Sequence, residues 1–272
     1  MKAVNIDEKG WIYGRWEVME NTWEIQDRHG VGAYLLIGEE KAMLIDTMYG
    51  DGDLRALIEE ITDRPVMVCN THGHIDHTGG NGFWEDAYMS EESTRDCKVA
   101  FGEEMQKRFD ALPHPDYRTH VLEDGQIIDL GGRKVLCIRI GAHHPGSMAY
   151  LDLSTGALFP GDEMEAGQVL LFLSELDWKD TVAKHLENME KLAAHGDKIK
   201  SIWPAHNGSP LTPRYLYDYI ELDKRILAGT AEEQPDLAGY NMGPDSSGLE
   251  SFFKCRVVRY RYGEASIVVK QQ

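Results

Sequence analysis

The densest set of metal-binding side chains lies in residues 71–80, which read Thr-His-Gly-His-Ile-Asp-His-Thr-Gly-Gly. Three histidines and one aspartate fall within six positions. They are His72, His74, Asp76 and His77. Imidazole and carboxylate groups are suitable ligands for zinc, iron or manganese. The apolar residues 66–69 come directly before, so we expect a loop at the end of a buried strand. One such loop supplies only part of a metal site.

Three later segments repeat this arrangement, with a histidine or aspartate just after a short apolar run and next to glycine or proline. They contain His143, Asp162 and His206. A single histidine in such a loop is more often structural than a metal ligand. Four loops of the same kind are harder to explain in that way and favour a common metal site.

The elements that would carry these loops alternate between strands and helices. Residues 33–37 and 42–45 predict a hairpin. Residues 51–62 predict a helix with Asp51 or Asp53 as N-cap, followed by a strand at 66–69. The first metal-binding loop therefore lies in a β-α-β context.

The rest of the chain continues this alternation. Strands are expected at 127–130, 134–140, 148–153, 157–159, 199–203, 252–260 and 265–270, and helices at 91–112, 177–195 and 213–228. No linker, low-complexity segment or internal repeat interrupts the pattern. We therefore predict one domain over residues 1–272, of layered α/β class.

Composition excludes several function classes. The formal net charge of −18 argues against nucleic-acid or anionic-membrane surfaces, because phosphate binding needs a basic face. No apolar run reaches the ~18 residues of a membrane span. The first eight residues carry charges where a signal peptide needs an apolar core. The four widely spaced cysteines form no CxxC motif, so we expect reduced thiols and a cytoplasmic location.

The motifs, taken in order, resemble those of the metallo-β-lactamase superfamily. Residues 72–77 form an HxHxDH motif, and His-x-Pro-Gly, Gly-Asp and Pro-x-His segments follow in the superfamily's order. The match runs from Tyr34 to the last predicted hairpin. The resemblance implies a four-layer αβ/βα sandwich, with two mixed sheets flanked by helices and a metal site at one edge.

The resemblance also implies how two metals would be held. One metal would take His72, His74 and His143. The second would take Asp76, His77 and His206. Asp162 would bridge the two.

One motif departs from the superfamily's usual His-Thr-Pro-Gly. Here it reads His-His-Pro-Gly, and alignment on Pro145 and Gly146 makes His143 the ligand. His144 then lies behind the ligands or lines the pocket.

Three further residues are weaker candidates for the site. Asp46 ends its strand and resembles an acidic residue that orients a ligand imidazole, with an ordinary strand-end cap as the alternative. Trp84 and Phe172 follow metal loops and could line a substrate pocket, although core packing is the commoner role for such residues. His185 and His195, on a predicted helix, are expected at the surface.

The resemblance implies a dinuclear metal-dependent hydrolase of a small-molecule ester, thioester, lactone or β-lactam. Two divalent ions, by default Zn²⁺ with iron or manganese as alternatives, would lower the pKa of a bridging water to near neutrality. Asp76 would bind metal and orient the nucleophile or accept its proton. The expected partner is a small-molecule substrate, with neither nucleic acid nor membrane, and homo-oligomerisation stays open.

Other functions compete with this one. A phosphodiesterase or nuclease of the same superfamily is disfavoured by the acidic charge. A redox role like that of the superfamily's diiron flavoproteins is disfavoured, because those proteins carry glutamate where His74 stands and add a flavodoxin domain, and both features are missing here. A mononuclear iron persulfide dioxygenase would leave the second ligand set, with His77 and His206, unexplained. A non-catalytic metal-binding protein is disfavoured by a full ligand set.

Overall fold

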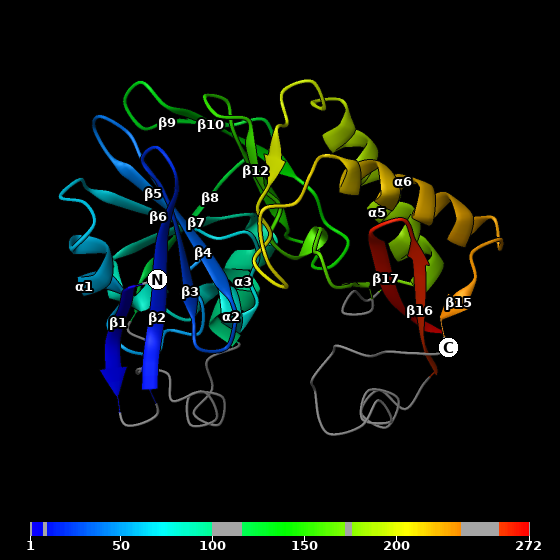
Figure 1. Cartoon of the computed structure of the whole chain (residues 1–272), viewed down its shortest axis with the longest axis horizontal. Helices are drawn as coiled ribbons and strands as arrows, with labels where there is room; N and C mark the ends of the chain where they lie inside the picture. The colour runs from blue at the N-terminus through cyan, green and yellow to red at the C-terminus, as the bar shows by residue number, and fades with distance from the viewer. Residues whose placement is uncertain (1, 8–9, 100–115, 172–175, 235–255, 272) are drawn as a thin grey trace. The chain divides into compact units, whose positions relative to one another are not determined.

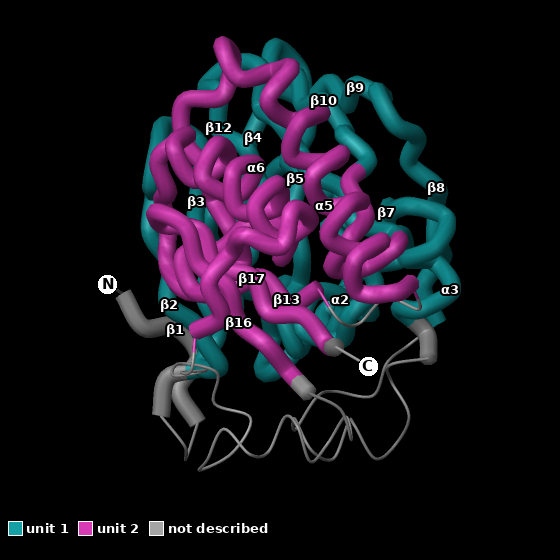
Figure 2. Tube along the Cα trace, turned by 90° about the vertical axis from the view of Figure 1, so that its right-hand side faces the viewer, with its two compact units in different colours: residues 1–139, 146–159 teal, residues 140–145, 160–272 magenta. Residues whose placement is uncertain are grey.

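The computed structural model describes residues 2–7, 10–99, 116–171, 176–234 and 256–271. The chain forms two compact units, coloured separately in Figure 2. Unit 1 comprises residues 1–139 and 146–159, and unit 2 comprises residues 140–145 and 160–272. The single domain predicted over the whole chain stays a prediction.

An eight-stranded mixed sheet runs through unit 1 in the order β1 to β8 (Figure 1). Its strands are β1 Lys2–Asp7, β2 Gly10–Met19, β3 Thr22–Asp27, β4 Gly32–Ile37, β5 Ala42–Ile45, β6 Val66–Cys69, β7 Asp86–Met89 and β8 Arg118–Val121. Neighbours from β1 to β5 are antiparallel, and neighbours from β5 to β8 are parallel. The predicted hairpin of β4 and β5 is confirmed.

Helices connect the parallel strands, as parallel pairing requires. They are α1 Leu54–Glu59, α2 Ile75–Thr78, the 3₁₀ turn η1 Asn81–Phe83 and α3 Glu91–Val99. Asp53 caps α1 by accepting the Ala56 N–H, and the predicted apolar face of α1 is buried. The predicted helix 91–112 is confirmed as far as Val99, and its remainder lies outside the described residues.

The core of unit 1 lies between these helices and the sheet. Leu35, Leu44 and Val68 come from three adjacent strands and pack with Leu57 of α1 and Cys97 of α3. Both faces of a parallel sheet are usually covered, which explains the continuous apolar sequences of these strands. The packed core fixes the carboxyl ends of β5 and β6, where the first candidate ligands begin.

A second group of strands in unit 1 forms an antiparallel meander. Its strands are β9 Ile127–Asp129, β10 Lys134–Arg139, β11 Met148–Asp152 and β12 Ala157–Phe159. The Met148 amide donates to the Thr71 carbonyl at 2.7 Å, and the Tyr150 hydroxyl donates to the Asn70 carbonyl at 2.7 Å. Strand β11 therefore holds the start of the ligand loop.

Unit 2 contains a mixed sheet in the order β13-β17-β16-β15 with two long helices against it (Figure 1). Its elements are the 3₁₀ turn η2 Gly161–Glu163, β13 Val169–Leu171, α5 Trp178–Ala193, β14 Ser201–Ile202, α6 Arg214–Leu227, β15 Glu233–Gln234, β16 Arg256–Tyr262 and β17 Ala265–Gln271. Strand β13 is parallel to β17, and β16 forms the predicted hairpin with β17.

The described elements confirm the predicted α/β class, with mixed sheets flanked by helices. Predicted and observed boundaries differ mainly at the ends of elements. Among the described residues, no helix has the length and apolar character needed to cross a bilayer.

Candidate metal centre

The loop that carries the first four candidate ligands is held firmly in unit 1. Its last turn folds into the short helix α2, and the His77 carbonyl accepts hydrogen bonds from the Thr47 amide at 2.9 Å and from Asn70 Nδ2 at 2.6 Å. The Gly79 amide donates to the Met48 carbonyl at 2.8 Å. A Cβ on Gly79 would overlap the backbone of the segment before Gly50, so the close approach requires glycine.

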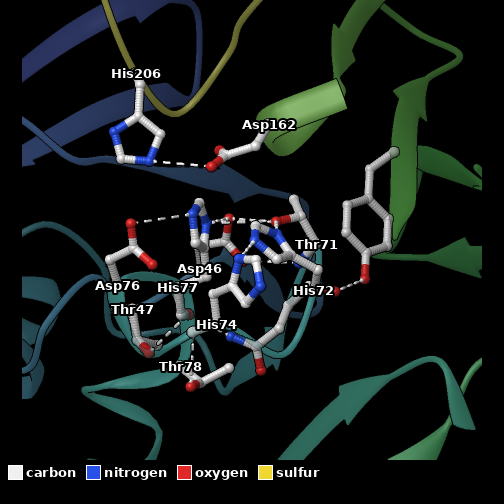
Figure 3. A network of polar contacts seen from close by, with 12 residues as sticks. Asp46, Thr47, Thr71, His72, His74, Asp76, His77, Thr78, Asp162 and His206 are labelled. Carbon is white, nitrogen blue, oxygen red and sulfur yellow. Dashed lines mark hydrogen bonds and ion pairs between the residues drawn. The ribbon is translucent and has the colours of Figure 1, made fainter. Parts of the chain in front are cut away.

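Asp46 contacts this loop through both carboxylate oxygens (Figure 3). Oδ1 accepts the Thr71 amide at 2.7 Å, and Oδ2 lies 2.8 Å from both the Thr71 hydroxyl and His77 Nδ1. Asp46 adopts a left-handed backbone (φ 62°), which aspartate and asparagine tolerate better than most residues. These contacts are what an imidazole-orienting role requires, and they go beyond a simple strand-end cap.

His72 and His74 bring two imidazole nitrogens together. His72 Nε2 lies 2.8 Å from His74 Nδ1, and His72 Nδ1 lies 3.1 Å from the Thr71 hydroxyl. His77 is fully buried, whereas the Asp76 side chain is 19% exposed and its Oδ2 lies 3.7 Å from His77 Nε2. Asp76 is therefore the carboxylate of the loop that solvent reaches.

In unit 2 the three later candidates converge. Asp162 Oδ2 lies 3.3 Å from His206 Nε2 and 3.6 Å from His143 Nε2 (Figure 3 draws the first contact). These separations are long for hydrogen bonds. They match the ~3.3 Å between two ligand atoms that share a tetrahedral metal at about 2.0–2.1 Å. One aspartate oxygen between two histidines is the arrangement expected of a bridging carboxylate.

Oxygen partners hold the Nδ1 atoms of three candidate ligands. His72 Nδ1 faces the Thr71 hydroxyl, His77 Nδ1 faces Asp46, and His143 Nδ1 lies 3.0 Å from the Leu170 carbonyl. A partner on Nδ1 fixes the tautomer in which Nε2 carries the lone pair that binds a metal. The donor types and their orientation therefore fit divalent metal ions, whose number and identity stay predictions.

The weaker candidates have different outcomes. Trp84 is half-buried and packs against the core of unit 1, where it also lines a hollow of about 800 Å³ together with Arg55 and Tyr88. His144 is buried. Phe172 lies outside the described residues. Substrate contacts by these three residues stay predictions.

His185 corrects the sequence analysis. It was predicted at the surface, but its side chain is fully buried and lies 2.7 Å from Asp223 Oδ2. It comes three residues after Val182 and four before Met189, on the buried face of α5. Helical periodicity could therefore have located it, although the partner on α6 could not be read from spacing.

Three polar residues that hold the ligands were not among the predicted site residues. Thr71 bonds Asp46, Thr47 bonds the His77 carbonyl, and Glu163 bonds the backbone at His143. Each is adjacent in sequence to a predicted site residue: Thr71 to His72, Thr47 to Asp46 and Glu163 to Asp162. Polar residues next to a ligand were the available signal.

A sequence profile of the metallo-beta-lactamase superfamily matches residues 27–228. The acyl-coenzyme A thioesterase MBLAC2 of Bos taurus is 24% identical over 223 residues, covering 70% of this chain and 76% of the relative. The hydroxyacylglutathione hydrolase of Gloeobacter violaceus is 28% identical over 137 residues, covering 49% and 50%.

The chain is also similar to an oxidase in sequence and to a solved structure in fold. The coenzyme F420H(2) oxidase of Methanothermobacter thermautotrophicus is 30% identical over 172 residues, covering 57% of this chain and 41% of the oxidase. The crystal structure of a metallo-beta-lactamase family protein from Thermus thermophilus superposes with a TM-score of 0.55 at 18% identity, covering 78% and 80%. The superposition confirms the predicted fold. The chain belongs to the metallo-beta-lactamase superfamily and is a metal-dependent hydrolase.

Proposed function

We propose that this hydrolase cleaves a small-molecule thioester at a dinuclear metal centre held by the seven predicted ligands. The thioester class rests on two relatives, one a thioesterase of acyl-coenzyme A and the other a hydrolase of an acylated glutathione. Esters, lactones and β-lactams are the other substrates predicted from the sequence, and none of the three sequence relatives reported above is named for one of them.

The observation that carries the proposal is the position of Asp162. Its Oδ2 lies between His206 Nε2 at 3.3 Å and His143 Nε2 at 3.6 Å, and these histidines are predicted to serve different metals. A carboxylate oxygen at ligand distance from both is the expected position of a bridging ligand. The metals would supply Lewis-acid polarisation of the carbonyl and a water of lowered pKa.

The remaining steps fall to the protein's own side chains. Hydrolysis adds water across the C–S bond of the thioester. A C–O bond forms at the acyl carbon, the C–S bond breaks, and a carboxylate and a thiol are released. Asp76, as the solvent-reachable carboxylate of the ligand loop, would orient the attacking water and accept its proton. Asp46 would keep His77 in the tautomer that binds metal, and Thr71 would hold the Asp46 carboxylate through its amide and hydroxyl.

A substrate panel tests the proposal. Metal-loaded protein would be assayed with acyl-coenzyme A and acyl-glutathione thioesters, oxygen esters with matched acyl chains, lactones, a β-lactam and a phosphodiester. We expect thioesters to have the highest kcat/KM, with activity lost on chelation and restored by Zn²⁺, Mn²⁺ or Fe²⁺. The control is metal-loaded protein with Asp162→Asn, which should retain the fold and lose turnover.

Other outcomes point to the competing functions. Phosphodiester cleavage without thioester cleavage would contradict the proposal in favour of a phosphodiesterase. One equivalent of iron with oxygen consumption on a persulfide substrate would indicate the dioxygenase. Metal binding with no turnover across the panel would favour a binding protein.

A further inference from the structure

Glu163 is fully buried beside the predicted bridging ligand Asp162, yet the metal-site prediction gives it no role. Its Oε1 accepts the backbone N–H groups of Ala142 and His143, both at 2.9 Å. A carboxylate forms stronger hydrogen bonds to backbone amides than a neutral acceptor does. Glu163 therefore fixes the peptide that carries His143, which lies twenty positions earlier in the sequence.

The ring of His143 is fixed separately. Its Nδ1 lies 3.0 Å from the Leu170 carbonyl, while its Nε2 points to Asp162 at 3.6 Å. With the backbone held by Glu163 and the ring held by Leu170, the position and rotation of His143 are both determined. His143 is therefore pre-organised for metal binding.

Glu163 is in turn held from behind by His185. The Glu163 carbonyl lies 3.0 Å from His185 Nε2, and His185 Nδ1 lies 2.7 Å from Asp223 Oδ2. A carbonyl oxygen only accepts, so Nε2 carries a hydrogen, and the Asp223 carboxylate takes a second hydrogen bond from Nδ1. The buried pair thus links α5 and α6 to the short turn η2.

That turn presents Asp162. Because η2 comprises only Gly161–Glu163, fixing the Glu163 carbonyl also limits the backbone that carries the Asp162 carboxylate. The two roles of Glu163 are separate in chemistry. Its side chain positions His143, and its main chain transmits the anchor at His185 to Asp162.

We propose that Glu163, anchored by the buried His185–Asp223 pair, is a positioning residue that pre-orients His143 and Asp162 for metal binding. The inference rests on the ligand assignment of the proposed function and is independent of the substrate. The alternative is that these groups only stabilise the packing of unit 2. A positioning role and a purely structural role predict different effects of a conservative change at Glu163 on metal affinity.

The test compares Glu163→Gln with Glu163→Ala. Glutamine keeps an acceptor oxygen at the same reach, whereas alanine removes it. Co²⁺ and Zn²⁺ affinities would be measured by competition with a chromophoric chelator, together with the visible spectrum of the Co²⁺ protein. We expect Glu163→Ala to lower metal affinity about 10- to 100-fold and to alter the Co²⁺ spectrum. Glu163→Gln should keep most of the wild-type affinity and a spectrum close to that of the wild type.

Asp223→Asn tests the anchor without touching Glu163. We expect weaker metal binding with the native Co²⁺ ligand set. The matched control is Glu190→Gln, because Glu190 pairs with Lys224 at 2.9 Å and joins the same two helices at the surface. This control should bind metal as the wild type does. Near-ultraviolet circular dichroism of each metal-free variant would establish that it is folded.

Two results would overturn the inference. The first is wild-type metal affinity and an unchanged spectrum in folded Glu163→Ala, and the second is an equal loss in Glu163→Gln and Glu163→Ala. Failure of the wild type itself to bind Co²⁺ or Zn²⁺ would instead refute the metal centre of the proposed function. The two failures are therefore distinguishable.

Discussion

Replacing Asp46 with asparagine is expected to move a proton on His77 from one ring nitrogen to the other. Asp46 Oδ1 accepts the Thr71 amide, so the oxygen of the introduced amide must stay there. Its NH₂ group then faces His77 Nδ1, which now lies 2.8 Å from the carboxylate. Two donors cannot face each other, so Nδ1 must become the acceptor and Nε2 must carry the hydrogen.

A protonated Nε2 cannot bind a metal without first changing tautomer. Loss of a carboxylate behind a metal-binding histidine costs about 10- to 100-fold in metal affinity, which corresponds to about 1.4–2.7 kcal/mol. Backbone strain adds little to this cost, because asparagine tolerates the left-handed φ of 62° at position 46. The variant therefore isolates the carboxylate from the backbone geometry.

Metal affinity would be measured by chelator competition, and the tautomer of His77 by ¹⁵N NMR of the metal-free protein. We expect Nδ1–H in the wild type and Nε2–H in Asp46→Asn. The control is Thr71→Val, which removes the hydroxyl that lies 2.8 Å from Asp46 Oδ2 but leaves the carboxylate facing His77. It should lose some stability and keep the wild-type tautomer.

Asp46 does not control the tautomer of His77 if Asp46→Asn keeps Nδ1–H and binds metal with wild-type affinity. A change of tautomer in Thr71→Val to the same extent would also contradict the prediction, since the hydroxyl rather than the carboxylate would then control His77.

Three further predictions follow from other residues. Asp162→Ala should abolish hydrolysis and lower the metal content measured by elemental analysis, and unchanged turnover would rule out a bridging role. Burial alone would favour a neutral His185, but the charge and hydrogen bond of Asp223 outweigh it and raise the pKa of His185 from 6.5 to about 9. This stabilisation is complete below pH 6.5 and is lost as the pH rises through 9. Urea denaturation of metal-free protein should show a loss of about 3 kcal/mol over this range. His185→Leu should lack that component, and an identical pH dependence would refute it. Gly79→Ala should cost about 3 kcal/mol in thermal unfolding through overlap with the backbone of Tyr49, whereas Gly125→Ala, which has open space but a φ of 79°, should cost about 1 kcal/mol from backbone strain alone.

Much of the architecture could be predicted because the local signals agree with the fold. Strand ends marked by Gly, Pro and a polar residue located the loop after β6 and the segments of His143, Asp162 and His206. The apolar face of α1 and the hairpins were equally readable, because each depends on residues close in sequence.

Contacts between distant residues could not be predicted in the same way. The partner of His185 lies 38 positions away on another helix, and Glu163 reaches a backbone amide 20 positions back. No periodicity encodes which buried acid faces which amide. The resemblance supplied the ligand set but none of the hydrogen bonds that orient it.

The six residues 140–145 have a consequence for dividing the polypeptide. The chain leaves unit 1 after Arg139, contributes this segment to unit 2 and returns at Gly146. A gene cut after Phe159 would therefore produce an N-terminal fragment that carries a piece of the other unit. In that fragment the amides of Ala142 and His143 would lack their acceptor on Glu163. Split-protein reconstitution at this junction thus requires reinsertion of an internal loop as well as association of two fragments, and we expect separately expressed halves to reassemble slowly.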